Sequence, residues 1–442
     1  MLIVIYLLIT ILFIVFSTAK YKIHPFLTLL IASLGMGVIS GLDVNFVIKT
    51  VTEGFGNTLK SIGIIIACGS IIGTFLEKTG AAKSIASKIL QITGSKNSAL
   101  AMNLTGSIVS IPVFCDSGFV ILSTLNNAIN KKTGISLSVL GTSLAAGLYA
   151  THVFVPPTPG PLAAASIIGA DVGLVLIFGL LLAIPVSVVG WFWASYYCSR
   201  FSINQNINNE TLSEQKNDDT NLTISIFTII IPIALITLKS IVNHPAIELE
   251  NIFINNIISF CGHPIIAMLF GVFIAMISAT GFSLEQHFDW VSNSLKSAGG
   301  IILITGAGGA FGNILRATPL GDTISQSLLG FEIGLLLPFI IAAFLKTAQG
   351  SSTVSIITTS AMVLPLLDSL GLSSEMGKVL TVLSIGAGAM TVSHLNDSYF
   401  WIVSQFSNMN TKTALHCHTA STLLQGLTSI ILIKFLSIFF LV

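Results

Sequence analysis

Long apolar stretches alternate with short polar segments along almost the whole chain. Because a helix needs about 20 apolar residues to cross the hydrocarbon core of a bilayer, these stretches predict transmembrane helices. The first apolar stretch is followed by Lys20 and Lys22 and has no basic segment before it, so we interpret it as a transmembrane span and not as a signal peptide. The uncharged stretches include 1–19, 24–42, 61–76, 97–115, 133–170, 172–199, 220–238, 251–284, 297–315, 347–367, 379–396 and 413–433.

The composition excludes a soluble protein. Only 8% of the 442 residues are charged and 53% are hydrophobic, whereas about 25% of the residues of a soluble protein are charged. Such a chain has too few charges to coat a surface in water, so its apolar residues must face lipid. The net charge of +1 does not suggest a nucleic-acid partner. The five cysteines are far apart in sequence and predict no disulfide framework.

The segment 98–125 conflicts with a simple crossing. A single crossing would put Lys131 and Lys132 outside, against the preference of basic loops for the cytoplasm. Its centre, residues 111–118, is polar and contains Pro112. Both features fit a re-entrant hairpin with its tip near Asp116, surrounded by protein or by a wet cavity.

We therefore predict an all-α polytopic membrane protein of two halves, each with about five transmembrane helices and one re-entrant hairpin. The first half is 1–199, with its hairpin at about 98–125 and a broken helix at about 137–170. A hydrophilic cytoplasmic linker, 200–222, follows. The second half is 223–442, with a hairpin at about 335–366 and a broken helix at about 379–405.

Internal similarity supports two repeats. His24-Pro25 recurs as His263-Pro264, 239 residues later, and His152 recurs as His394, 242 residues later. An odd number of crossings in each half makes the repeats inverted in the membrane. Inverted repeats with broken helices at the membrane midplane are typical of secondary transporters.

Four polar segments interrupt the apolar spans at matching positions of the halves: 110–117, 152–161, 346–353 and 393–398. A broken helix exposes backbone N–H groups at a half-helix N-terminus, where the helix dipole favours an anion. Hydroxyl and amide side chains there suit a hydroxylated ligand. These features predict a small polyhydroxylated anion as the substrate. The candidate binding residues are Thr158, Gly160, Ser351, Ser352, Thr353, Asn396, His152 and His394.

Three ionisable residues near these breaks have two interpretations each. Asp116 and Asp397 either carry a proton with the substrate or cap a helix; burial of a carboxyl favours its protonated form. Lys346 either neutralises the substrate carboxylate or extends its ammonium to the membrane interface. The histidines His152 and His394 either contact the substrate or are satisfied core residues.

Three other motifs predict no ligand site. The glycines of 306–312 lie inside an apolar span and follow no strand, so they indicate close helix packing and not a dinucleotide loop. The segments 285–289 and 416–418 contain residues of metal-ligand type, but both flank spans and are expected to face water. We predict no metal and no cofactor.

At the broken segments the sequence resembles the gluconate:H⁺ symporter family of bacterial inner-membrane permeases. The resemblance covers essentially the whole chain, and its motifs are Ile111–Val120, His152–Ala165, Gly306–Gly312, Gln349–Val354, Gly386–Met390 and Ser393–Trp401. It implies proton-coupled uptake of gluconate or a related acid, a homodimer, and an elevator-type movement of a transport domain. Some relatives carry His in place of Thr158, which leaves glycerate, a hexuronate-derived acid and D-serine open as substrates.

We therefore predict a symporter of the bacterial cytoplasmic membrane that imports a sugar acid with at least one proton. An anion entering a negative cell interior is opposed by ~2.3 kcal/mol per charge per 100 mV, and one proton cancels that charge. Sodium coupling remains an alternative. The rivals from other classes are a passive channel and an intramembrane enzyme that would use Asp116 and Asp397 as a carboxylate pair.

Overall fold

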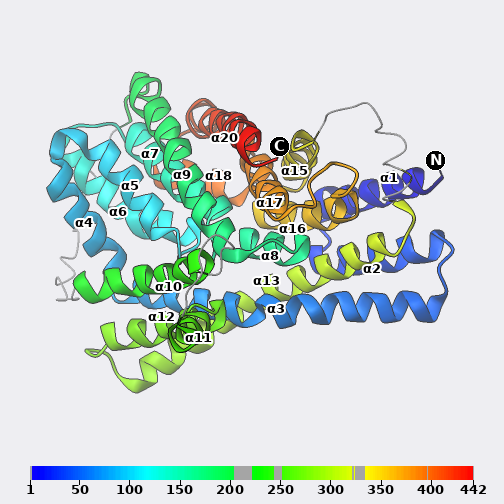
Figure 1. Ribbon diagram of the computed structural model, residues 1–442. Coiled ribbons are helices and arrows are strands. Elements are labelled where there is room, and N and C mark those ends of the chain that lie inside the picture. Colours follow the sequence, from blue (N-terminus) through cyan, green and yellow to red (C-terminus); the bar gives the residue numbers. More distant parts are fainter. Residues whose placement is uncertain are drawn as a thin grey trace.

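The computed structural model describes residues 2–203, 222–242, 251–320, 323, 334–395 and 397–441, and within them every regular element is helical (Figure 1). The linker predicted at 200–222 lies mostly outside the described residues. The first-half elements are α1 Leu2–Val15, η1 Phe16–Lys20, α2 Pro25–Ile39, α3 Val44–Lys78, α4 Ala81–Thr93, η2 Ser95–Asn97, α5 Ser98–Val109, α6 Cys115–Thr133, α7 Leu137–Phe154, α8 Pro159–Ile168, α9 Val172–Tyr196 and η3 Cys198–Arg200. The second-half elements are α10 Leu222–Val242, α11 Ile252–Cys261, α12 Pro264–Ser278, α13 Leu284–Arg316, α15 Leu336–Gln349, α16 Ser352–Val363, η4 Leu364–Leu366, α17 Glu375–Met390, α18 Ser398–Phe406, α19 Thr411–Ala414, η5 Leu415–Thr419 and α20 Ala420–Phe440.

The described helices have the length and composition of membrane spans. Six are long and apolar enough to cross a bilayer, and a seventh span results if the bent pair α11 and α12 is counted as one. Four shorter apolar helices accompany them, two in the N-terminal region and two at the predicted second hairpin. The prediction of an all-α membrane bundle is confirmed.

All four predicted interruptions are breaks between helices. α5 ends at Val109 and α6 begins at Cys115; α7 ends at Phe154 and α8 begins at Pro159. In the second half α15 gives way to α16 at Gly350, and α17 ends at Met390 before α18 begins. Two of the breaks follow directly from residue type. Prolines cannot donate a helical hydrogen bond, and Gly350 adopts a left-handed φ of 83°.

The two longest helices differ from the sequence prediction. The uncharged stretches that predict spans begin at 61 and 297, but the segments 44–60 and 284–296 before them are also helical and form the first parts of α3, of 35 residues, and α13, of 33 residues. Neither segment contains a proline, and Asp43 and Ser283 cap the two helix starts. α3 and α13 pack side by side and form the most extensive helix contact in the described structure. In Figure 1 the pair runs along the lower right of the view, with α2 next to it.

Glycines allow these helices to approach closely. A Cβ at Gly309 would lie 1.9 Å from the Thr58 hydroxyl of α3, and one at Gly308 would lie 2.1 Å from Ile357 of α16. The glycine segment 306–312 is thus buried at contacts of α13 with α3 and α16. The prediction that this segment serves helix packing is confirmed.

The core lies where α7 and α17 pass through the bundle. Every residue of α7 is buried, and so is almost every residue of α17. α7 packs against α5, α9 and α17, and α17 packs against α15 and α20. Both helices end at breaks, so the ends of two interrupted helices lie in the most deeply buried part of the protein.

The closest backbone approach in this core lies between α5 and α7. A Cβ at Gly147 would lie 2.0 Å from the backbone oxygen of Asn103. The Asn103 amide also donates hydrogen bonds to the carbonyls of Ser143 and Ser187, at 3.0 and 3.2 Å. Asn103 therefore links α5 to both α7 and α9, and Gly147 provides the space for that link.

We predict that Gly147→Ala lowers stability because it forces α5 away from α7. Overpacking of this kind costs about 1–3 kcal/mol. The measurement is the thermal unfolding temperature of the detergent-solubilised protein. Gly35→Ala is the matched control, because Gly35 lies in α2 with nothing within 4 Å of its Cβ position. The control is expected to melt at or slightly above the wild-type temperature. Equal melting of the two variants would contradict the packing argument.

Candidate functional site

The two breaks of the first half face α3. A small pocket between them is lined by Gly69, Ser70, Pro112, Phe114, Pro157 and Thr158, among others. A Cβ at Gly73 would lie 2.6 Å from the backbone oxygen of Pro112, so the glycines of α3 let both breaks approach this helix. Two segments about 45 residues apart in sequence thus line one small pocket, in which Ser70 and Thr158 have the polar side chains.

The two breaks of the second half are joined by an ion pair. The Lys346 Nζ lies 2.6 Å from Asp397 Oδ2, and the side chains are 1% and 4% exposed. The ammonium also donates to the carbonyl oxygen of Gly350, at 2.7 Å. Lys346 is in the last turn of α15, and Asp397 is the N-cap residue of α18. The expectation that Lys346 reaches the membrane interface is therefore wrong.

Asp397 has further partners that fix its carboxylate. Its Oδ1 accepts a hydrogen bond from the Tyr399 backbone N–H at 3.0 Å, and its Oδ2 accepts one from the Ser393 hydroxyl. The helix-cap interpretation of Asp397 is confirmed, since it caps α18, and its carboxylate also binds a buried cation; its role as a proton carrier stays a prediction. The other two ion pairs found in the described ranges lie at the surface, at 3.9 Å.

Two tyrosines connect the halves beside this ion pair. The Tyr149 ring centroid is 5.8 Å from the Lys346 ammonium and 5.2 Å from the Tyr399 ring centroid. The Tyr149 hydroxyl donates to the carbonyl of Ala389 at 3.3 Å, and the Tyr399 hydroxyl donates to the carbonyl of Ala145 at 3.2 Å. Each tyrosine therefore donates a hydrogen bond to a backbone carbonyl of the other half.

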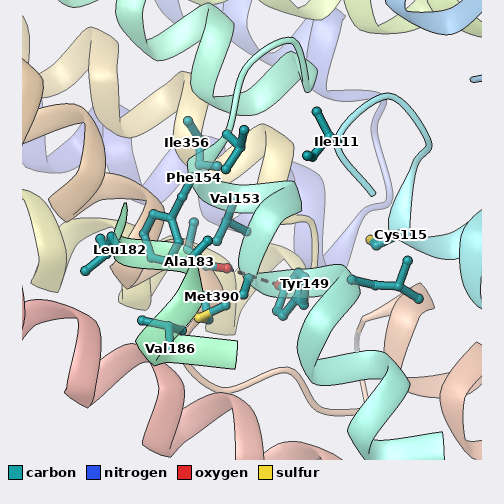
Figure 2. Close-up of a cluster of buried hydrophobic side chains, with 14 of the residues drawn as sticks. Ile111, Cys115, Tyr149, Val153, Phe154, Leu182, Ala183, Val186, Ile356 and Met390 are labelled. Atoms are coloured by element: carbon teal, nitrogen blue, oxygen red, sulfur yellow. Dashed lines mark hydrogen bonds between the residues drawn. The ribbon is translucent and has the colours of Figure 1, made fainter. Parts of the chain in front are cut away.

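Apolar side chains surround the tyrosines. Figure 2 shows Tyr149 and Cys115 in one cluster with Val153, Phe154 and Met390, all of them buried. These side chains come from both halves. They separate the ion pair from bulk water, which strengthens electrostatic interactions inside the site.

The predicted hydroxyl residues lie at helix starts. Thr158 is the N-cap residue of α8, and its hydroxyl donates to the carbonyl of Val155. Ser351 is the N-cap residue of α16 and accepts from the Val354 N–H at 3.3 Å. Ser352 is buried and Thr353 is half-buried in the first turn of α16.

Gly160 lies where α8 meets α16. A Cβ at this position would come within 2.8 Å of the Ile356 side chain. The close contact brings the starts of α8 and α16, one from each half, into the same region. Asn396, a further predicted binding residue, lies outside the described residues.

The other predicted polar residues occupy different environments. Asp116 is half-buried in the first turn of α6, whose N-cap is Phe114 and whose start has no side-chain cap, so the capping interpretation of Asp116 is wrong. It is near enough to interact electrostatically with Asp397 and Lys346. His152 is buried, and its Nδ1 has no hydrogen-bond partner. His394 is half-buried in the break after α17.

Sequence reasoning missed several residues of this region. Tyr149, Tyr399 and Ser393 make the contacts described above, and both amide atoms of Gln349 are buried without a partner. His418 was expected to face water, but its side chain is 1% exposed and its Nε2 is 3.1 Å from the Ser393 hydroxyl. The sequence did point to Ser393, because it lies in the most distinctive family motif. It gave no indication that His418 is buried, because the neighbours of His418 in sequence border a polar loop.

The region offers no constellation for a metal. Over the part of the chain that the structure describes, no three His, Cys, Asp or Glu side chains are grouped as metal ligands would be. All five cysteines are free thiols. Lys346, Asp397 and His418 instead pair with one another or with the Ser393 hydroxyl.

The sequence matches known permeases along its whole length. A family profile described as "GntP family permease" matches residues 2–439. The chain is 31% identical to a gluconate permease of Pseudomonas aeruginosa, covering 98% of this chain and 96% of that protein. It is 32% identical to the D-serine transporter DsdX of Escherichia coli, with 96% of each chain covered.

The fold is also known among solved transporters. It is similar to that of MtrF from Neisseria gonorrhoeae, with a TM-score of 0.67 at 14% identity over 95% of this chain and 96% of that chain. The apolar helices and the inner-membrane permeases among its relatives make it a multi-pass protein of the bacterial inner membrane, a transporter and not an enzyme. The chain belongs to the GntP permease family.

Proposed function

We propose that this permease imports a small hydroxylated carboxylate together with at least one proton, and that gluconate is the first candidate. Relatives of about 30% identity are named for gluconate and for D-serine, both of which carry a carboxylate and at least one hydroxyl. Glycerate and a hexuronate-derived acid share this chemistry. The region between the four helix breaks supplies groups for both parts of such a ligand.

The observation that carries the proposal is the buried Lys346–Asp397 ion pair. Removing two charges from water costs several kcal/mol per ion, and a charge inside a membrane protein marks a functional site by default. A substrate carboxylate can compete with Asp397 for the ammonium of Lys346. When the substrate takes that place, Asp397 loses its cation and binds a proton, so the loaded site has the same net charge as the empty one.

This exchange accounts for coupling. Without the proton, the loaded site would hold an additional negative charge in a low-dielectric environment. Entry of the anion alone would also be opposed by ~2.3 kcal/mol per 100 mV of membrane potential. Binding of substrate and of a proton therefore favour each other, and the proton gradient drives accumulation. Asp116, half-buried and near Asp397, is the second candidate proton carrier.

The hydroxyl groups of the substrate would be bound by the helix starts. α8 and α16 begin next to each other with backbone N–H groups that lack helical partners. The hydroxyls of Thr158, Ser351, Ser352 and Thr353 and the unpaired Nδ1 of His152 add donors and acceptors. We include Gly160, His394 and Asn396 in this proposed site on their sequence positions.

We also propose that the halves are inverted repeats. The supporting observation is the common order of elements: α2 and α3 correspond to α12 and α13, and α5–α8 correspond to α15–α18. The final long helices α9 and α20 pack against α7 and α17, respectively. This arrangement would put a broken helix and a hairpin of each half at one shared site.

We predict that Asp397→Asn abolishes proton-driven accumulation, because an amide cannot carry the coupled proton. The measurement is uptake of labelled gluconate into proteoliposomes with and without an imposed pH gradient. Accumulation should fall by roughly tenfold or more, which corresponds to about 1.4 kcal/mol. Counterflow exchange at equal pH should stay measurable.

Asp116→Asn is measured in the same way and identifies the carrier. If Asp397 is the coupled carboxyl, Asp116→Asn retains gradient-driven accumulation. If accumulation is lost in Asp116→Asn alone, the proton belongs to Asp116 and the charge exchange at Lys346 is wrong. Wild-type flux that ignores the pH gradient would indicate a channel, and flux that requires sodium would indicate sodium coupling.

We predict that Lys346→Met destabilises the protein by about 3–5 kcal/mol because it leaves the Asp397 carboxylate buried without its cation. The double variant Lys346→Met/Asp397→Asn removes both charges and should recover most of the thermal stability. Neither variant should bind gluconate in a thermal-shift titration.

Lys49→Met is the control, because Lys49 belongs to a surface pair with Glu53 at 3.9 Å. Its stability and gluconate-induced shift should match the wild type. A gluconate-induced shift in the double variant would rule out Lys346 as the group that binds the substrate carboxylate.

A further inference from the structure

A buried histidine extends the hydrogen-bond network of Asp397 through Ser393. His418 Nε2 lies 3.1 Å from the Ser393 hydroxyl oxygen, and that hydroxyl donates to Asp397 Oδ2. We propose that Ser393 and His418 form the route by which the coupled proton leaves Asp397 toward the cytoplasm. This inference rests on the proposed function, because it requires a proton that arrives with the substrate.

The backbone around Ser393 is fixed by the turn that carries His418. The Ser393 N–H donates to the Thr422 hydroxyl at 3.0 Å, and the Thr419 hydroxyl donates to the Ser393 carbonyl at 2.6 Å. The preceding residue, Val392, adopts a left-handed φ of 61°, which is unfavourable for a β-branched residue. The side chains of Thr419 in η5 and Thr422 in α20 thus hold Ser393 so that its hydroxyl lies between the Asp397 carboxylate and the His418 imidazole.

The groups that face His418 from neighbouring elements are few and well defined. The Tyr399 ring of α18 lies edge-on at 5.3 Å, and the Phe400 ring lies at 6.4 Å. The charged groups that act on the imidazole are Asp397 and, from α15, Lys346. Within η5 itself the neighbours are the buried thiol of Cys417, which contacts Cys198 of η3, and the exposed His416. Lys412 of α19 is exposed.

The route leads to the end of the bundle that precedes the linker. His416, two residues before His418, is exposed, and its ring stacks on Phe201 with 6.0 Å between centroids. Its carbonyl accepts a hydrogen bond from the Trp193 indole at 3.2 Å. The distribution of basic residues predicts that this end, which includes Arg200, is cytoplasmic.

The structure fits the state after proton release, since the Ser393 hydroxyl donates to the Asp397 carboxylate. Protonated Asp397 gives its proton to the Ser393 oxygen, while Ser393 gives its own hydroxyl proton to His418 Nε2. No bond between heavy atoms changes, and one unit of positive charge moves from Asp397 to the imidazole. Afterwards Ser393 donates to the Asp397 carboxylate, as in the structure, and Nε2–H would donate to Ser393 across the 3.1 Å between Nε2 and the hydroxyl oxygen. The imidazolium then loses its Nδ1 proton to water, and the neutral ring moves its remaining proton from Nε2 to Nδ1 before the next cycle.

Departure of the substrate provides the driving force for this step. Once Lys346 is no longer neutralised by a substrate carboxylate, its ammonium attracts Asp397 again, at 2.6 Å in this structure. That attraction favours the ionised form of Asp397 and expels the proton. Ser393, which contacts the same Asp397 oxygen as Lys346, and His418 offer it a path.

His418→Gln tests the route. A glutamine amide can still donate to Ser393, but it cannot accept and release a proton. In proteoliposomes, counterflow of labelled gluconate at equal pH should stay within about twofold of wild type. Accumulation driven by a pH gradient, and acidification reported by a dye inside the vesicles, should slow by roughly tenfold or more. His416→Gln is the matched control from the same turn and should behave as wild type in both assays.

Each result separates the possibilities. If His418→Gln accumulates gluconate and acidifies the vesicle interior at the wild-type rate, the route is wrong. If His418→Gln loses counterflow as well, the histidine only positions Asp397, and the route is again wrong. Ser393→Ala should reproduce the selective loss, because a methyl group cannot pass on a proton. If wild-type protein shows no gluconate counterflow, the proposed function fails, and that failure is distinct from the other outcomes.

Discussion

An ammonium and a carboxylate buried in an apolar bundle must receive from the protein the hydrogen bonds and polar contacts that water would otherwise supply. Lys346 and Asp397 receive them from the Gly350 carbonyl, the Ser393 hydroxyl and the Tyr399 backbone N–H, which lie at the two breaks of the second half, and from an aromatic ring of α7. The cation lies at the C-terminal end of α15 and the anion at the N-terminal end of α18, so both helix dipoles favour the pair. The ion pair and the helix breaks therefore depend on each other.

Close packing around the breaks keeps this arrangement in place. α7 and α17 are buried along almost their whole length and end at interruptions, and Tyr149 of α7 and Tyr399 of α18 hydrogen-bond across to the other half. Glycines at the crossings of α3, α5, α7 and α13 bring backbones within reach of one another. An ion pair held so firmly would exchange partners only for a ligand of matching charge, which is the property that a coupled transporter of anions requires.

The positions of the helix breaks could be predicted from the sequence, and the partners of the site residues could not. Prolines at 156, 157, 159 and 161 forbid a continuous helix wherever the chain goes, and Gly350 favours the same outcome at the third break. The starts of α3 and α13 could not be predicted from the uncharged stretches, because the polar segments 44–60 and 284–296 before them contain nothing that prevents a helix. The sequence left two interpretations of Lys346 open, because its neighbours in sequence do not include its partner 51 residues later.

By itself the sequence determined that the chain is a helical membrane protein, where four of its helices stop, and to which family it is similar. These properties depend on residue type and on near neighbours in sequence: the length of apolar stretches, prolines that lack an N–H donor, and the residues of short motifs. The tertiary structure decided that Lys346 binds Asp397, that Tyr149 and Tyr399 link the halves, and that His418 is buried beside Ser393. Such contacts join residues that are distant in sequence, and a side chain's burial and partner are set by the helices that pack around it.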